Sequence, residues 1–407
     1  MRTTNNHEDM TRRLLAPCGD LDSTRESVRL DISGLVCRLL LFETYILESI
    51  RLLEIPALVR LFGYGGFLEL LESGVLEIKT GGRGICVVDS TPPGIPTTHP
   101  GVHTVRQVGF ADPVKVTNEN LATALRRLDL RKRERDRLGA AVRNVLRVVS
   151  PDGTAVAQEQ LQCDLLRTSD EVRMAVSMAL RRKCDIETGI DDFDLEYRLE
   201  GDGAYRHVTN LGKVYGLDIH QVHGVLENAI VAMGGLETRI EAMERLQAIA
   251  GFTGDDLPLF ECKLGMLYRA MVPEKSEASL RRVLGIARVP VPEGAEITID
   301  AAKLLKIRES AEHREFINWL PKAATLTDEE IQDAVASFGA RASTLIHGPM
   351  GKVARFLAVT GIGAIPGAGM VLGAAAGALD TFLLKRLIPC SGLATFVNRQ
   401  YPSLFQK

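Results

Sequence analysis

The residues best suited to chemistry are basic side chains between positions 124 and 137, where the chain reads ALRRLDLRKRERDR. This run holds seven basic and three acidic residues. An exposed basic residue can neutralise one phosphate, and the arginine fork matches phosphate oxygens in pairs. We therefore predict an anionic-surface or phosphate contact made by Arg126, Arg127, Arg131, Lys132, Arg133 and Arg135.

The acidic residues of this run support an alternative interpretation. They repel the same phosphate backbone, and the run contains no aromatic side chain that could stack on bases. Asp129 and Arg133 are four residues apart, a spacing at which side chains pair along a helix. The run therefore also fits a solvated helix that carries ion pairs on its surface.

A second pattern combines charge with large aromatic side chains between positions 308 and 320, RESAEHREFINWL. Arg308 and Glu312 are four residues apart, and the same helical row continues to Phe316 and Trp319. Arginine and tryptophan are enriched where protein partners bind. We predict that these four residues form a partner-binding surface. The alternatives are an amphipathic helix with its charges at the rim, and a catalytic role.

The remaining polar clusters lack the residues that a metal or catalytic site would need. His220 and His223 could share a metal ion from one helix face, but no third ligand stands at a recognisable spacing. Four carboxylates between residues 191 and 196 could bind Mg²⁺, but Asp194 and Glu196 alternate with apolar residues, which is typical of an exposed strand face. The chain also contains no P-loop, nucleophile elbow or kinase signature. We therefore expect no metal, no cofactor and no catalytic residues, and the sequence favours a non-enzymatic protein.

An uncharged segment, residues 356–379, lies near the carboxyl end. A continuous helix of this length would span about 36 Å, enough for a bilayer core of about 30 Å. Glycines recur in it every four residues, which lets a second helix approach closely. A proline divides the segment, so we predict a close-packed apolar helical hairpin over residues 351–387. Its packing or membrane contact would be set by Gly363, Pro366, Gly367, Gly369, Gly373 and Gly377.

This segment leads to our first functional hypothesis, a non-enzymatic interaction or effector protein that associates with a membrane through residues 356–379. Its partner would be another protein or a second copy of the chain. Three alternatives stay open: a soluble scaffold or regulatory protein with the hairpin buried in its core, a nucleic-acid-associated regulator that uses residues 126–137, and an enzyme of unrecognised class. Seven scattered cysteines and a polar amino terminus favour the cytoplasm, with association to the inner face of the membrane as a further expectation.

The elements that must position these residues are predicted to be mostly helices. Aromatic residues make up 5% of the chain, and strong helix formers dominate it. Apolar residues between 30 and 61 recur at helical spacing, and residues 118–149 form a charged helical stretch. The prediction is a mainly α (α+β) fold, and a doubly wound parallel sheet is disfavoured. Two small antiparallel hairpins are expected, from residues 75–79 with 85–89 and from residues 193–199 with 204–208.

Proline and glycine residues suggest how the chain divides. Pro290, Pro292 and Gly294 mark the main internal boundary. The predicted regions are a polar tail (1–27), a helical segment with a small hairpin (28–112), a helical middle region with the second hairpin (113–289) and a C-terminal helical region with the glycine-spaced hairpin (295–407).

Overall fold

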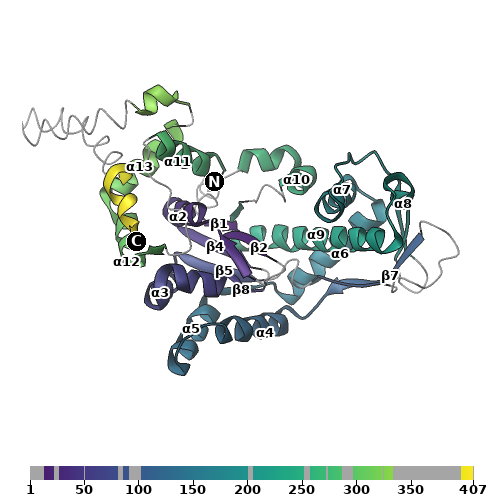
Figure 1. The fold of residues 1–407 in the computed structure, drawn as a ribbon, viewed down its shortest axis with the longest axis horizontal. Coiled ribbons are helices and arrows are strands. Elements are labelled where there is room, and N and C mark those ends of the chain that lie inside the picture. The colour runs from purple at the N-terminus through teal and green to yellow at the C-terminus, as the bar shows by residue number, and fades with distance from the viewer. Residues whose placement is uncertain are drawn as a thin grey trace, which may run out of the picture. The chain divides into compact units, whose positions relative to one another are not determined.

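The computed structural model describes residues 13–22, 27–49, 51–80, 86–90, 102–199, 205–251, 257–271, 274–286, 297–323, 325–332 and 396–406. Helices form most of this part of the chain, and short strands form a parallel sheet and antiparallel pairs. The predicted mainly α, α+β class is therefore confirmed (Figure 1).

The described residues divide into two compact units. The first unit contains the described residues up to Met271, apart from the stretches 36–41 and 59–70. The second unit contains those two stretches and the described residues from Glu274 onward. The helices α2 (Ile32–Leu41) and α3 (Glu54–Glu72) therefore contribute residues to both units.

A five-stranded parallel sheet lies in the first unit. In spatial order its strands are β11 (Ile249–Ala250), β1 (Arg13–Ala16), β4 (Thr44–Ser49), β5 (Leu76–Thr80) and β8 (Leu146–Val148). The inner strands β1 and β4 carry apolar side chains on both faces, and Leu14, Leu15, Ile46 and Leu47 are all buried. Such strands need helices on both faces of the sheet.

Helices cover the two faces of this sheet (Figure 1). The carboxyl end of α9 (Ile219–Leu246) packs on one face, where Ala242 and Leu246 join Leu15 and Ile46 in a buried cluster. The helices α4 (Pro113–Arg126) and α5 (Lys132–Val145) lie against the other face. There the hydroxyl oxygens of Thr80 on β5 and Thr117 on α4 are 2.8 Å apart.

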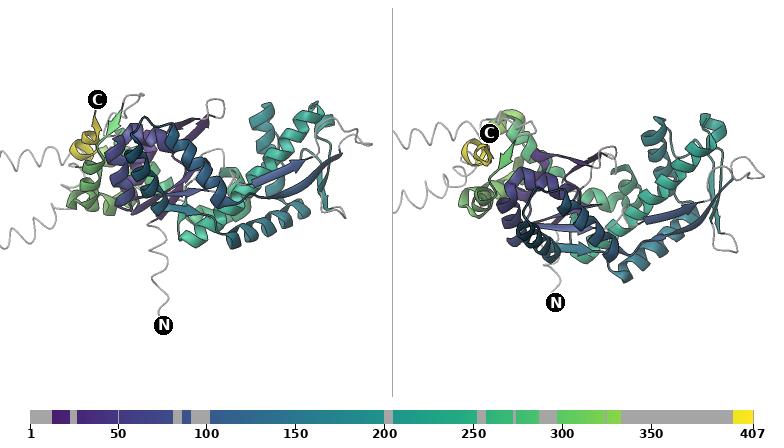
Figure 2. Two further views of the ribbon diagram at one scale, coloured as in Figure 1. Left: turned by 90° about the horizontal axis from the view of Figure 1, so that it is seen from below. Right: turned by 60° about the horizontal axis from the view of Figure 1, so that its bottom comes forward.

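A four-stranded antiparallel sheet is the other main sheet of the first unit (Figure 2). In spatial order its strands are β6 (Cys86–Ser90), β7 (Val102–Phe110), β10 (Tyr205–Thr209) and β9 (Leu195–Leu199). It shares a core with α9 and with α6 (Pro151–Arg167), α7 (Asp170–Cys184) and α10 (Leu257–Met271). The first unit also contains the strand pair β2 (Gly19–Asp22) and β3 (Ser27–Leu30), and the short helix α8 (Leu211–Tyr215).

The second unit is built around aromatic side chains near the carboxyl end. Its elements are α11 (Glu274–Ile286), α12 (Ala301–Glu309), α13 (Ala311–Ala323), a π-helical turn η3 (Phe396–Gln400), a 3-10 turn η4 (Pro402–Leu404) and the strand pair β12 (Thr298–Ile299) and β13 (Phe405–Gln406). The rings of Phe316 and Phe396 stack at 4.3 Å. His313 is buried beside them, its Nε2 is 2.9 Å from the carbonyl oxygen of Leu40, and burial lowers its pKa to about 4.

The parallel sheet was not expected from the sequence. Residues 44–49 interrupt the predicted helical stretch between 30 and 61, because a short strand buried on both faces has no periodicity that separates it from a buried helix. Residues 76–80 pair with β4 and β8 rather than with residues 86–90, which pair with β7. Part of the predicted polar tail forms β1. The second hairpin, β9 with β10, is confirmed.

The predicted glycine-spaced hairpin, residues 351–387, lies outside the described residues. Within the described part of the chain, no helix combines the length and the apolar character needed to cross a bilayer.

Candidate functional site

The predicted phosphate-contact residues gather where α4 ends and α5 begins. Residues 118–149 do not form one continuous helical stretch: α4 ends at Arg126, α5 begins at Lys132, and β8 follows α5. The break carries neither glycine nor proline, so it could not be predicted from the sequence. We call the exposed or half-buried basic residues at this break the basic turn: Arg126, Arg127, Arg131, Lys132, Arg133 and Arg135.

Apolar packing fixes the geometry of the basic turn. Leu121 of α4 and Leu138 of α5 are both fully buried, and Leu128 in the connection is 8% exposed. The two helices meet closely at Gly139, where an added Cβ would lie 3.0 Å from the Cδ1 of Leu125. Because these contacts face inward, the basic side chains are left on the outside.

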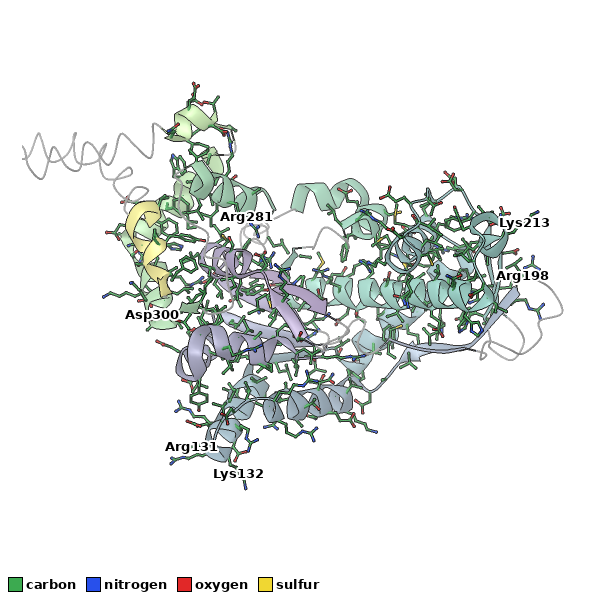
Figure 3. All side chains as sticks on the ribbon, viewed as in Figure 1. Arg131, Lys132, Arg198, Lys213, Arg281 and Asp300 are labelled. Carbon is green, nitrogen blue, oxygen red and sulfur yellow. The ribbon has the colours of Figure 1, made fainter. Side chains whose placement is uncertain are left out.

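Most cations of the basic turn are exposed. Arg126, Arg131, Lys132 and Arg133 are exposed, and none of them forms an ion pair with a described residue. Arg126 only donates to its own helix, to the carbonyl of Ala122 and the hydroxyl of Thr123. Figure 3 shows Arg131 and Lys132 at the start of α5, directed away from the ribbon.

The acidic residues nearby do not compensate these cations. The carboxylate of Glu134 accepts the backbone N–H of Arg131 at 2.8 Å and thereby caps α5. Asp129 lies in the connection before α5, so the expected ion pair with Arg133 along one helix does not form. The solvated-helix interpretation with internal ion pairs is therefore wrong for this pair.

The helix dipoles have opposite effects on the cations at the two ends of the basic turn. Arg126 and Arg127 lie at the carboxyl end of α4, where a cation is stabilised by the partial negative charge of the helix. Arg131, Lys132 and Arg133 lie at the amino end of α5, where the helix is already positive and each cation costs about 0.3–1 kcal/mol. The helix dipole therefore does not favour these three charges.

The predicted partner-binding residues do not form a single helical row. Arg308 lies on α12, whereas Glu312, Phe316 and Trp319 lie on α13, because the chain is extended at Ser310 between the two helices. Phe316 is fully buried. Trp319 is half-buried, with its ring 6.4 Å from that of Phe316. The proposed role in partner binding stays a prediction.

The residues predicted to set the packing or membrane contact of the C-terminal hairpin lie outside the described part of the chain, so the membrane hypothesis stays a prediction as well. They are Gly363, Pro366, Gly367, Gly369, Gly373 and Gly377.

The other polar clusters considered from the sequence have local partners. His223 lies 3.1 Å from Glu227, and Asp218 caps the start of α9. Asp194 accepts from Asn210, and Glu196 pairs with Arg198. Among the described residues, no group of three or more histidine, cysteine, aspartate or glutamate side chains is arranged to hold a metal ion.

A buried charge cluster lies between α6, α9 and α10 and was not expected from the sequence. Lys263 forms ion pairs with Asp164 and, at 3.2 Å, with Glu237. Asp164 is 5% exposed and Glu237 is 4% exposed. Burial raises the pKa of Glu237 to about 7. The three residues are far apart in the sequence, so only the packing of the helices could reveal the cluster.

Comparison with known proteins identified no relative. No family model, no curated protein and no solved structure matches this chain.

Proposed function

We propose that the protein is a non-enzymatic interaction protein that binds nucleic acid through the phosphate backbone at the basic turn. The observation that carries this proposal is that four cations of the basic turn, Arg126, Arg131, Lys132 and Arg133, are exposed at the α4–α5 break and form no ion pair with a described residue. Five of the six residues are arginine, whose planar fork binds phosphate oxygens in pairs.

The composition of the surface points to backbone contacts rather than base recognition. Residues 126–137 contain no aromatic side chain on which an exposed base could stack. Contacts to phosphates position a protein on a duplex but carry no sequence information. We therefore expect binding that depends on the salt concentration and hardly on the base sequence.

Nucleic acid fits this surface better than a membrane does. Peripheral membrane binding combines cations with apolar side chains that insert below the headgroups. Among the exposed large apolar side chains of the described residues, none lies between positions 117 and 137. A rigid array of phosphates needs only the cations that the basic turn presents.

The test is a fluorescence anisotropy titration of a labelled DNA duplex of random sequence with the full chain at low salt. The triple variant Arg131→Ala, Lys132→Ala, Arg133→Ala is expected to bind at least about tenfold more weakly, because three phosphate contacts are lost. A duplex of different sequence should bind the wild-type protein equally well.

A matched control distinguishes a local site from general charge attraction. Arg181, Arg182 and Lys183 are also consecutive and exposed, at the carboxyl end of α7. The variant Arg181→Ala, Arg182→Ala, Lys183→Ala has the same net charge as the basic-turn variant and should keep the wild-type affinity. Equal losses in both variants, no binding by the wild type, or tight binding to phosphatidylserine vesicles but not to DNA would each refute the proposal.

A further inference from the structure

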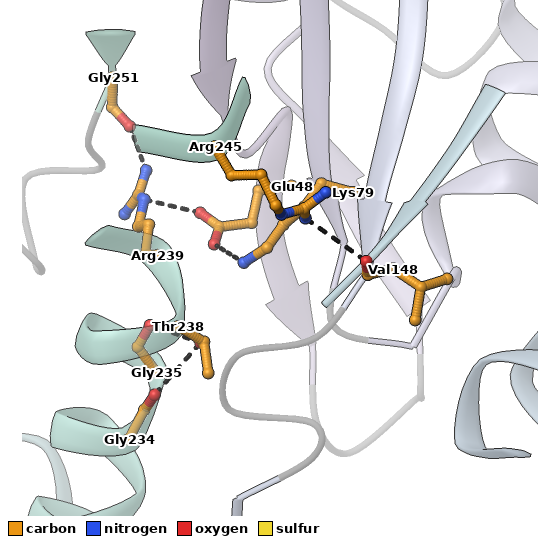
Figure 4. Close-up of polar contacts among 9 residues, drawn as sticks. All are labelled: Glu48, Lys79, Val148, Gly234, Gly235, Thr238, Arg239, Arg245 and Gly251. Atoms are coloured by element: carbon orange, nitrogen blue, oxygen red, sulfur yellow. Dashed lines mark hydrogen bonds and ion pairs between the residues drawn. The ribbon is translucent and has the colours of Figure 1, made fainter. Parts of the chain in front are cut away.

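Charged side chains from several elements meet at the carboxyl ends of the parallel strands (Figure 4). Glu48 and Lys79 are register partners near the ends of β4 and β5. The Glu48 carboxylate bridges two cations, since it lies 3.1 Å from the Nζ of Lys79 and 2.8 Å from the Nε of Arg239 on α9. We call Glu48, Lys79 and Arg239 the strand-end cluster.

The strand-end cluster is held rigidly in place. Arg239 donates to the carbonyl of Gly251 just after β11, and its guanidinium lies 5.1 Å from the centre of the Phe260 ring. Arg245 lies beside the cluster, paired with Glu241 at 2.8 Å and donating to the carbonyl of Val148 at the end of β8. The ends of β4, β5, β8 and β11 therefore converge around these side chains.

The ammonium group of Lys79 has room for further hydrogen-bond acceptors. Its side chain is 0% exposed, and an ammonium group carries three N–H donors. Within the described residues its only ion-pair or hydrogen-bond partner is Glu48, which also pairs with Arg239. A buried cation is costly unless its donors are satisfied. An additional anionic oxygen at this position would satisfy the remaining donors of Lys79.

The position in the fold favours a ligand as the source of that oxygen. In open sheets of parallel strands, ligands bind outside the carboxyl ends of the strands. An ammonium beside a guanidinium is suited to a phosphate group, because the first supplies a point charge and the second a planar pair of donors. The basic turn is carried by α4 and α5, which cover the opposite face of the sheet, so it is a separate surface.

We propose that the strand-end cluster binds a phosphate group of a small anionic ligand, with Lys79 and Arg239 as its donors. Glu48 then holds both cations in position and competes with the ligand for them. This site is independent of the nucleic-acid surface, and each can fail without the other.

The experiment is isothermal titration of the full chain with inorganic pyrophosphate at constant ionic strength. The wild-type protein should bind it, and Lys79→Met should weaken the affinity at least about tenfold, since a charge-assisted hydrogen bond is lost. Arg13→Met is the matched control, because Arg13 is a cation on the same sheet face, at the amino end of β1, where it pairs with Glu77 of β5. It should leave the affinity unchanged.

A second variant keeps the test decisive if Lys79→Met does not fold. Glu48→Gln keeps the shape of the side chain and removes the competing negative charge, so it should tighten pyrophosphate binding several-fold. The basic-turn triple variant should bind pyrophosphate like the wild type. No binding by the wild type, a Glu48→Gln affinity no tighter than wild type, or loss of binding in the basic-turn variant would overturn the proposal and leave the strand-end cluster as an internal ion network.

Discussion

At the residue scale, Glu237 shows how burial controls a titration. It lies beside Asp164 and Lys263, so two carboxylates share one ammonium group. Burial raises the pKa of Glu237 from its ordinary 4.5 to about 7; Lys263 opposes the rise and Asp164 adds to it. The folded protein therefore holds a proton at a pH where the unfolded chain has released it.

This difference predicts how stability depends on pH. Between pH 4.5 and about 7 the folded state binds more protons at Glu237 than the unfolded state, so its contribution to stability falls as the pH rises through that window. Glu237→Gln removes this contribution. Urea unfolding at a series of pH values should therefore show the wild type losing stability relative to Glu237→Gln as the pH rises. Parallel curves for the wild type and Glu237→Gln would contradict the assignment, and exposed Glu119→Gln serves as the control.

Two glycines on the same helix give a second residue-scale prediction. A Cβ on Gly234 of α9 would lie 2.6 Å from the Sγ of Cys86 on β6, whereas a Cβ on Gly224 meets nothing within 4 Å. Gly234→Ala should destabilise the protein by about 1–3 kcal/mol through overpacking. Gly224→Ala should stabilise it by up to about 1 kcal/mol through helix propensity. Denaturant unfolding of the two variants checks both signs, and a stabilising Gly234→Ala would refute the close approach of α9 to β6.

At the scale of elements, the basic turn is expected to reduce stability. Arg131, Lys132 and Arg133 stand at the positive end of α5, whereas Arg181, Arg182 and Lys183 stand at the negative end of α7. Replacing the first three by alanine should raise the thermal unfolding midpoint, and replacing the second three should lower it. A shift of the unfolding midpoint in the same direction in both variants would mean that the helix dipoles do not determine the change in stability.

How far the sequence predicts these elements depends on how local their signals are. The β9–β10 hairpin follows from alternation around Gly201 and Gly203. The parallel sheet does not follow, because its strands are short and the two partners of β5 lie far away in sequence. The break between α4 and α5, where Leu128 is buried, has no glycine or proline to mark it.

The two candidate sites also differ in how close their residues lie in the sequence. The basic turn could be predicted by residue number, because its cations are close in sequence. The strand-end cluster could not, because Glu48, Lys79 and Arg239 meet only through strand register and the position of α9. A single lysine or glutamate in an apolar strand is a weak signal until the neighbouring strand is known.

At the scale of the whole molecule, the chain carries a net charge of −3. Overall charge therefore does not attract a polyanion, and binding depends on the local potential at the basic turn. Salt screens charges beyond about 8 Å at physiological ionic strength, so distant acidic residues have little effect there. The nucleic-acid proposal involves residues of the first unit only.

The salt dependence of DNA binding tests the central claim most directly. Each phosphate contact contributes about 0.9 to the slope of log affinity against log salt concentration. If Arg131, Lys132 and Arg133 each contact a phosphate, their replacement by alanine lowers the magnitude of this slope by about 2.7, while replacement of Arg181, Arg182 and Lys183 leaves it unchanged. A wild-type slope near zero, or the same slope in both triple variants, would contradict the assignment of the basic turn as the nucleic-acid surface.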